Sequence, residues 1–255
     1  MSMDPLLQLI LPYLLLLARV SAFLMALPIF GWTSLPMVVR AGLAMTMTMF
    51  FAMAGIGRFE LVELSSVSSL GIGLLVVREI ACGAALGLAV HFVFQAVQQA
   101  ASMMAMQMGH GDAGIMDPSM GGESSAITML MEMSFVLLFL AAGGHLLLMQ
   151  ILQRSLVVFP LGGQVDFGAL AEGLLRAGST MLMFALKLAG PVLAGFLVLS
   201  VVLGVLARVL PEMNVLTQSF PLRVGLGLLL AAATLPSLER FGVQLGGWLN
   251  KFLIQ

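Results

Sequence analysis

The sequence predicts an all-α membrane protein whose helices are broken in several places. Of its 255 residues, 60% are hydrophobic and only 9% are charged, and the mean hydropathy is +1.10. A soluble domain carries about 25% charged residues, so the composition excludes that class. The apolar residues also gather into long runs, and about 20 apolar residues in a helix span the hydrocarbon core of a bilayer.

These runs define six candidate membrane helices. They extend over Leu6–Phe30, Ala41–Gly57, Leu70–Val97, Ile127–Leu152, Thr180–Leu206 and Val224–Leu238. We expect Pro12 and Pro28 to interrupt the first and Pro191 the fifth, because proline removes a backbone donor inside a helix. The second and sixth are short for a full crossing. The pattern therefore predicts irregular spans.

Charged residues within the apolar runs are a second irregularity. They are Arg19, Arg78, Glu79, Glu132 and Lys187. Each costs about 2.5–3.5 kcal/mol when it faces lipid at the bilayer centre, so these side chains should face other protein or water. Glu132 and Lys187 carry opposite charges on separate segments, and we expect each to find a partner in this chain or in another subunit.

A capped amphipathic helix is predicted between the fourth and fifth segments. Asp166 precedes the stretch FGALAEGLLRAG, whose apolar residues recur at helical spacing. Aspartate is a favoured residue before the first helical turn, and glycine commonly follows the last one, so this helix should end at Gly178. We interpret it as a surface helix that packs on the bundle rather than a lipid-binding helix.

Small residues recur at four-residue spacing in three of the apolar segments. The pairs are Gly83 with Gly87, Gly190 with Ala194, and Ser200 with Gly204. Small side chains let two helix backbones approach closely. Contacts within the chain and contacts with partner subunits agree equally well with this spacing, and the sequence leaves both open.

The remaining composition predicts no cofactor, no metal and no nucleic-acid partner. The formal net charge is −1, whereas a nucleic-acid-binding protein needs a basic stripe to neutralise phosphates. The single cysteine, Cys82, has no intramolecular disulfide partner. His91 and His145 each stand alone on an apolar helix, and we interpret them as buried side chains with one hydrogen-bond partner rather than as a proton relay.

The stretch QMGHGDAGIMDPSMGG, residues 107–122, lies between two apolar segments. Six methionines fall within residues 103–122, although the whole chain of 255 has only 21, and clustered thioethers can seal an irregular gap and later repack. The glycines and the Asp117-Pro118 pair favour turns. Non-helical backbone at membrane depth must be buried in protein or line a water-filled cavity. A plain connector on the solvent side remains the alternative.

Two chemical interpretations of this loop are weaker. Gly109, His110, Gly111 and Asp112 match the Gly-x-Gly-Asp signature of intramembrane aspartyl proteases. That chemistry needs two aspartates that share a proton, and no second aspartate lies in an apolar segment. His110 with the nearby carboxylates and methionine sulfurs mixes soft and hard ligands, so the set matches no single metal.

Four longer motifs together resemble the FliR/SpaR/YscT-like family, whose FliR members belong to the flagellar type III export gate. They are ARVSAFLMALPIFG with Pro36 and Arg40 following, QMGHGDAGIMDP, GGHLLLM with the later FPLGG, and RVLPEMNVLTQSFPLRVG. The resemblance covers nearly the whole chain. Two positions depart from it: Gly143-Gly144, where the family often has an asparagine before the histidine, and Glu212, where it has a glutamine.

The resemblance implies a subunit of a helical pore assembled from helical hairpins. Residues 1–175 would form a FliP-like portion and residues 176–255 a FliQ-like helical hairpin, and the chain would assemble with FliP-like and FliQ-like subunits. The loop would plug the closed pore through Met106, Met108, Gly109, His110, Gly111, Asp112, Gly114, Met116, Asp117, Pro118, Met120, Gly121 and Gly122.

The implied function is a non-catalytic channel that passes unfolded flagellar proteins across the bacterial inner membrane. The gate would belong to the flagellar basal body and project to the periplasmic side. An FlhB-like switch protein, expected at the connection between Arg208 and Arg223, and an FlhA-like export component would be further partners. The alternatives are a small-solute secondary transporter and, less favoured, the aspartyl protease.

Overall fold

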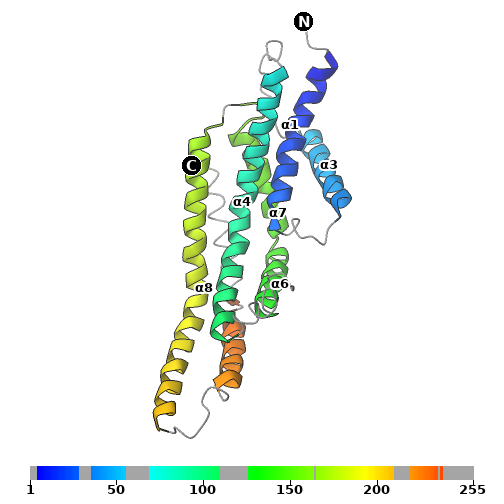
Figure 1. The fold of residues 1–255 in the computed structure, drawn as a ribbon. Helices are drawn as coiled ribbons and strands as arrows, with labels where there is room; N and C mark the ends of the chain where they lie inside the picture. Colours follow the sequence, from blue (N-terminus) through cyan, green and yellow to red (C-terminus); the bar gives the residue numbers. More distant parts are fainter. Residues whose placement is uncertain are drawn as a thin grey trace. The chain divides into compact units, whose positions relative to one another are not determined.

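The computed structural model shows a helical chain (Figure 1). It describes residues 5–28, 36–55, 69–109, 126–163, 165–209, 219–234 and 236–237. Within these ranges every regular element is a helix and none is a strand. The prediction of an all-α membrane protein is confirmed.

The helices follow one another in chain order. They are α1 (Pro5–Ala26), α3 (Met37–Met53), α4 (Ser69–Gln107), α6 (Ala126–Ala141), α7 (Gly144–Val158), α8 (Phe167–Val209) and a further helix, Ser219–Thr234. Two of them, α4 and α8, are long and apolar enough to cross a membrane, and α6 with α7 qualifies as one broken span. The other helices are apolar but shorter.

The helix-breaking signals of the sequence act less often than expected. Pro12 lies inside α1 and Pro191 inside α8, so the predicted interruptions at these two positions are wrong. Asp166 does cap α8, because its Oδ1 accepts hydrogen bonds from the backbone N–H groups of Gly168 (2.8 Å) and Ala169 (3.2 Å). The predicted end at Gly178 is also wrong, since α8 continues to Val209.

Several segment boundaries differ from the prediction as well. The third segment was expected to end at Val97, but α4 continues to Gln107. The fourth segment consists of two helices, α6 and α7, separated at Ala142 and Gly143, which agrees with the prediction of broken helices. Gly143 has a φ of +80°, a left-handed conformation that glycine adopts without steric cost.

The chain divides into two compact units, which α4 and α8 both enter. Unit 1 comprises Met1–Phe92, Gly144–Gly178 and Leu245–Gln255, and unit 2 comprises Val93–Gly143 and Ser179–Gln244. This grouping by spatial contacts does not test the expected FliP-like and FliQ-like portions, which remain a prediction.

In unit 1, α1 packs very closely on α4. A Cβ atom at Gly83 would collide with the backbone oxygen of Arg19, and one at Gly87 would lie 2.7 Å from the backbone oxygen of Phe23. Only glycine allows this approach, so the first pair of small residues serves a contact within the chain. Figure 1 shows α1 running alongside this part of α4.

In unit 2, aromatic rings hold α6 against the second half of α4. The ring of Phe94 lies edge-on to those of Phe135 and Phe139, with both centroid distances at 5.2 Å, a favourable aromatic geometry. On the second half of α8, a Cβ at Gly195 would meet the side chain of Leu230 on the helix Ser219–Thr234. This helix therefore packs against α8.

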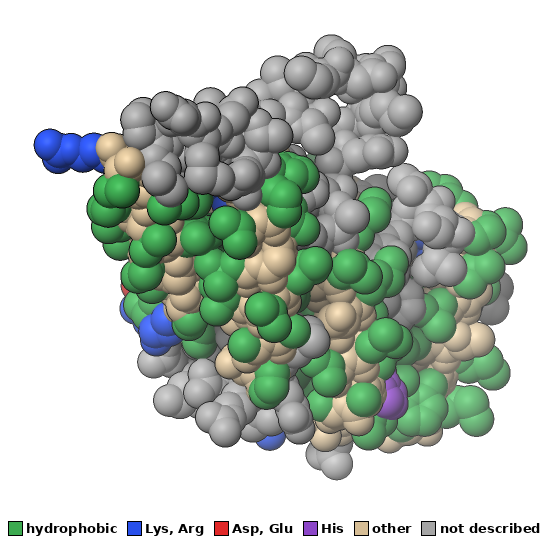
Figure 2. Space-filling model, turned by 90° about the horizontal axis from the view of Figure 1, so that it is seen from below, with side chains coloured by type: hydrophobic (Ala, Val, Ile, Leu, Met, Phe, Trp, Pro, Cys, Tyr) green, Lys and Arg blue, Asp and Glu red, His purple; other side chains and the backbone are tan. Residues whose placement is uncertain are grey.

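Much of the second half of α8 remains exposed. The exposed large apolar residues there include Leu182, Met183, Leu186, Leu197, Val198, Val201, Val202, Val205 and Leu206. Figure 2 shows the same character on the face that it presents, where hydrophobic side chains cover most of the described surface and charged ones are few. Such a surface suits lipid or neighbouring membrane helices.

Candidate functional site

The predicted plug residues begin where α4 ends. Met106, Met108 and Gly109 lie within the described residues. The other ten predicted plug residues lie outside them: His110, Gly111, Asp112, Gly114, Met116, Asp117, Pro118, Met120, Gly121 and Gly122. The structure therefore describes the origin of the loop.

The methionines at this end of α4 have different surroundings. Met106 is 57% exposed, whereas Met108 and Met104, about one helical turn before it, are both fully buried. Met108 therefore belongs to the packed core of unit 2, and Met106 projects from it. The sequence predicts one cluster of methionines in this region. It gives no signal that distinguishes the buried Met108 from the exposed Met106.

Glycine ends α4 through its conformation. Gly109 has a φ of +86°, and its N–H donates to the carbonyl of Met106 at 3.1 Å. The N–H of Met108 donates to the carbonyls of Met104 and Ala105, both at 3.2 Å. A left-handed glycine after the last turn is a common helix stop, so the chain leaves helical geometry directly before His110.

The helix Ser219–Thr234 contacts all three residues at this end. The Arg223 guanidinium donates from Nη1 to the carbonyl oxygen of Gln107 at 3.2 Å. A Cβ at Gly109 would lie 3.7 Å from the ring of Phe220, and one at Gly227 would overlap the side chain of Met108. In Figure 1 this helix, coloured orange, lies beside the lower end of α4.

Sequence reasoning did not connect these residues with the loop. Phe220 and Arg223 were noted only as part of the motif RVLPEMNVLTQSFPLRVG, and Gly227 lies two residues after the end of this motif. The structure thus brings two of the motifs that carried the family resemblance into contact, although Gln107 and Arg223 are 116 residues apart.

A buried ion pair forms the polar centre of unit 1. Nε of Arg19 donates to Oε2 of Glu79 at 2.5 Å, and the two side chains are 0% and 2% exposed. Nη1 of Arg19 also donates to the backbone carbonyls of Phe159 (2.7 Å) and Ser155 (3.2 Å). The N–H of Gly162 donates to Oε1 of Glu79 at 3.0 Å.

This network joins α1, α4 and the end of α7. Ser155 lies in the last turn of α7 and Phe159 directly follows the helix, and the Ser155 carbonyl also accepts a hydrogen bond from the N–H of Phe159 at 2.9 Å. The positive guanidinium sits where the helix dipole is negative. Sequence reasoning placed Arg19 and Glu79 among the charges at membrane depth but did not pair them, because neither residue type nor spacing identifies the partner.

The other three charges at depth are less enclosed in the single chain. The carboxyl of Glu132 receives a hydrogen bond from the side chain of Gln98 and is half-buried. Lys187 is exposed, with its Nζ 5.5 Å from the centroid of the Phe184 ring. Arg78 is half-buried. An intersubunit partner for Lys187 remains a prediction.

The histidines and possible metal ligands support no reaction centre in the described part of the chain. His91 bonds to the backbone of Ala26, as expected for a histidine with one partner, whereas His145 is exposed, so its predicted burial is wrong. Among described residues, no group of three or more His, Cys, Asp or Glu side chains has a metal-binding arrangement. The loop residues considered for metal binding lie outside that part.

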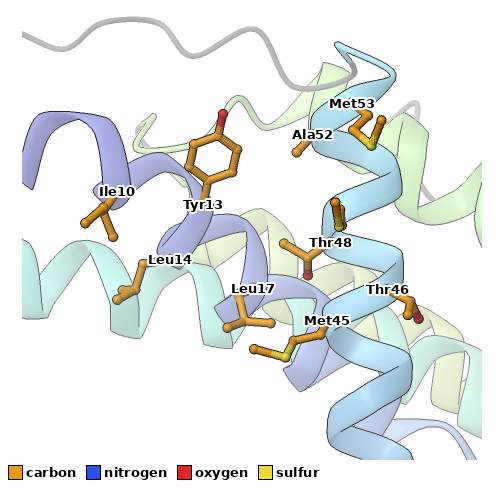
Figure 3. Close-up of a pocket in the computed structure, with 10 residues that line it drawn as sticks. Ile10, Tyr13, Leu14, Leu17, Met45, Thr46, Thr48, Ala52 and Met53 are labelled. Carbon is orange, nitrogen blue, oxygen red and sulfur yellow. The ribbon is translucent and has the colours of Figure 1, made fainter. Parts of the chain in front are cut away.

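A groove in unit 1 lies between α1 and α3 (Figure 3). Its volume is about 720 Å³, and it is lined by Ile10, Tyr13, Leu14, Leu17, Met45, Thr46, Thr48, Met49, Ala52 and Met53. The hydroxyls of Thr46 and Thr48 donate to backbone carbonyls of α3 itself. The lining contains no acidic or basic side chain, so the groove suits an apolar occupant and not a charged solute.

Comparison with known proteins relates the chain to bacterial export machinery. Residues 10–245 match the family described as bacterial export proteins, family 1. The chain is 34% identical to the flagellar biosynthetic protein FliR of Escherichia coli over 225 residues, which cover 88% of this chain and 84% of that protein.

Similar coverage extends to more distant relatives. Identity to FliR of Bacillus subtilis is 27% over 234 residues, covering 89% of this chain and 87% of the relative. Identity to the Yop proteins translocation protein T of Yersinia pestis is 24% over 226 residues, covering 87% and 84%. The similarity therefore includes both flagellar and virulence-system proteins.

Proposed function

The chain belongs to the bacterial export proteins, family 1, and on this premise we propose that it is a structural channel subunit of the flagellar type III export gate. Its membership of this family makes it a membrane-embedded component of a type III export apparatus. The channel passes unfolded flagellar proteins across the bacterial inner membrane. The observation that carries the proposal is the match to FliR proteins along nearly the whole chain.

The surface of α8 supports assembly with partner subunits. A Cβ at Gly190 or Gly204 would have no neighbour within 4 Å, so these two members of the small-residue pairs make no close packing contact within the described chain. Ala194 and Ser200 are exposed on the same helix. Close-packing residues left open in this way suit neighbouring membrane helices, which we assign to FliP-like and FliQ-like subunits.

The loop after α4 is proposed to plug the closed pore. Its methionines supply an apolar constriction, and a hydrophobic constriction blocks ions by excluding water. Its glycines allow the backbone to change direction. The exposure of Met106 supports this assignment, because a side chain that projects at the loop's origin is free to contact a partner subunit.

Residues 1–175 are proposed to form a FliP-like portion and residues 176–255 a FliQ-like hairpin. The connection from Arg208 to Arg223 contacts the FlhB-like switch protein on the side where substrate enters, and an FlhA-like component completes the export machinery. The assembled gate lies in the flagellar basal body and projects to the periplasmic side. Site-specific cross-linking from Asn214 or Gln218 tests the switch contact, and exclusive capture of periplasmic partners contradicts it.

One observation favours a secondary transporter as a second candidate. In secondary transporters, discontinuous helices meet at the substrate site. In this chain, α6 and α7 together form a broken span. The groove between α1 and α3, however, has no charged lining. A monodisperse, stable monomer that transports a solute without partners would favour the transporter. The protease interpretation predicts that Asp112→Ala abolishes a proteolytic activity.

Deletion of residues 110–120 tests the plug directly. We expect assembly to continue but cells to become leaky to ions and small solutes, with secretion reduced less than the leak is increased. The measurement is ion conductance normalised to the amount of assembled complex, with the parent chain as control. A plain connector predicts either no effect or failed folding, and an intact seal in assembled complexes removes the plug assignment.

A further inference from the structure

Two exposed cations enclose a long apolar stretch of α8. Lys187 and Arg208 are both exposed, and the 20 residues between them include no charged side chain. At a rise of about 1.5 Å per residue, the two positions are about 32 Å apart along the helix axis. The hydrocarbon core of a bilayer is about 30 Å thick, so the stretch Leu188–Ala207 has the length of one membrane crossing.

Both cations lie on the same face of α8. They are 21 residues apart, and with about 3.6 residues per turn this separation leaves only about 60° between them around the helix. The exposed apolar residues between them on this face are Ala194, Leu197, Val198, Val201 and Val205. The helix therefore carries a continuous apolar surface with a cation at each end.

Lys187 points away from this stretch. Its Nζ lies 5.5 Å from the centroid of the Phe184 ring, and Phe184 precedes it by three residues, so the side chain extends toward the start of α8. A lysine at the end of a membrane helix extends in this way, with its charge directed out of the hydrocarbon toward the interface. This direction also avoids the cost of a charge at the bilayer centre.

Arg208 stands at the other end, in the last turn of α8. Among the described residues neither Arg208 nor Lys187 forms an ion pair, whereas Arg223, the third described cation of unit 2, donates to the Gln107 carbonyl. Guanidinium and ammonium groups both bind phosphate, and headgroup phosphates lie at both boundaries of the hydrocarbon. The charges of a bilayer are therefore complementary to both ends of the stretch.

The surroundings of the last turns of α8 favour a bilayer over a single partner helix. All residues from Val201 to Val209 are exposed except Leu203, and all except Arg208 are apolar. A partner helix covers one face, whereas acyl chains surround a helix on every open side. A helix that is apolar all round is typical of a membrane span.

We propose that α8 binds the phospholipid bilayer along Leu188–Ala207, and that Lys187 and Arg208 each contact a headgroup phosphate, one in each leaflet. This assignment goes beyond the proposed function, because it fixes the depth of α8 in the membrane. Partner helices that pack at Gly190 or Gly204 lie at the same depth and cover part of the circumference. A carboxylate of a neighbouring subunit is the competing occupant at Lys187.

The first test measures depth in the assembled export gate, reconstituted into vesicles of phosphatidylcholine and phosphatidylglycerol. Leu186, Leu197 and Val209 are exposed, and the variants Leu186→Cys, Leu197→Cys and Val209→Cys each carry a nitroxide label. Oxygen concentrates in the hydrocarbon and a water-soluble nickel complex stays outside it, so the relative accessibility of the label to the two reagents gives its depth. Cys82 is buried, and complexes without a new cysteine measure the background.

The label at Leu197 should be the deepest. Leu197 is 10 residues from Lys187 and 11 from Arg208, so it should lie about 15 Å below both headgroup levels, whereas Leu186 and Val209 should lie near them. A profile whose deepest label is not at Leu197 overturns the proposal. Low accessibility of the Leu197 label to both reagents also overturns it, because partner protein would then cover the stretch.

The second test concerns the phosphate contact at Lys187, with phosphatidylglycerol titrated onto the detergent-solubilised gate and followed by native mass spectrometry. Lys187→Gln should weaken phosphatidylglycerol binding about fivefold, the effect of one basic residue near an anionic surface, and Lys187→Arg should retain it. Arg176→Gln is the matched control and should bind as the parent does, because Arg176 is an exposed cation outside the stretch that already pairs with Glu172.

Equal phosphatidylglycerol binding by Lys187→Gln and the parent gate overturns the headgroup contact, as does the loss of a neighbouring subunit instead of lipid. The depth profile leaves Lys187 unchanged, so it decides the proposal if the Lys187→Gln gate does not assemble. Neither test measures secretion or ion leak, so the bilayer contact and the proposed channel function can fail independently.

Discussion

Removing one partner of the buried Arg19–Glu79 pair should destabilise the chain more than removing both. Arg19→Ala leaves the Glu79 carboxylate buried with the Gly162 N–H still donating to it but with no counter-charge, and it leaves the carbonyls of Ser155 and Phe159 without their cation. Glu79→Gln leaves the Arg19 guanidinium buried without a counter-charge. Each variant therefore leaves one buried charge without a counter-charge, and this lowers the free energy of unfolding.

The expected magnitude follows from the enclosure of the pair. Because both side chains are at most 2% exposed, the full penalty of a broken buried pair applies, about 3–5 kcal/mol. At the usual 2–4 °C per kcal/mol for a chain near this size, the thermal midpoint falls by about 6–20 °C. The double variant Arg19→Met with Glu79→Leu should lie within a few degrees of the parent, because apolar replacement of an ion pair is often neutral.

Thermal aggregation of the purified gate complex measures these midpoints. The Glu172–Arg176 pair on α8 is the matched control, because it is an exposed helical pair at 2.6 Å and such pairs contribute little. Arg176→Ala should therefore leave the midpoint almost unchanged. If Arg19→Ala and Glu79→Gln shift it no more than Arg176→Ala does, or if the double variant is the least stable of all, the reasoning about buried charge is refuted.

Three further predictions concern glycines and a cap. Gly83→Ala should reduce the yield of assembled complex, because its Cβ collides with backbone of α1, whereas Gly73→Ala on the same helix has open space; equal yields contradict the close packing. Gly190→Leu and Gly204→Leu should leave the helicity of the chain intact but block co-purification with partner subunits, since a Cβ at either position meets no described residue within 4 Å, and normal co-purification would place the interface elsewhere. Asp166→Ala should destabilise α8 by about 1 kcal/mol through loss of its cap, with Asp166→Asn retaining most of the stability in thermal unfolding; identical effects of both variants would refute the cap.

Sequence patterns predicted the helical class well because they depend on composition and on long apolar runs. They failed at local signals that compete with a long helix. Glycine costs a helix only about 1 kcal/mol, so Gly178 does not stop α8, and transmembrane helices tolerate proline because neighbouring groups compensate the lost bond, which explains Pro191. Gly143 ends a helix because it adopts a left-handed conformation, and residue type alone does not distinguish it from Gly178.

The candidate site was predictable only in part for a related reason. Local composition identifies the Met/Gly-rich loop, since six methionines in twenty residues need no partner to be recognised. The contacts that hold its origin join Met108 to Gly227 and Gln107 to Arg223, and contacts over such sequence separations leave no periodic signal. The same applies to Arg19 and Glu79, whose pairing depends on how three helices pack.

The Arg19–Glu79 pair also imposes an order on biogenesis. Glu79 follows Arg19 by 60 residues. The residues that supply the two carbonyls, Ser155 and Phe159, follow Arg19 by 136 and 140 residues. At a synthesis rate of about 5–20 residues per second, the nascent arginine waits about 3–12 s for its counter-ion and about 7–28 s in all for the carbonyls at the end of α7. During this interval α1 carries an unpaired cation in an apolar segment, which costs about 2.5–3.5 kcal/mol at the bilayer centre, so the insertion of α1 becomes more favourable once α4 supplies the counter-ion.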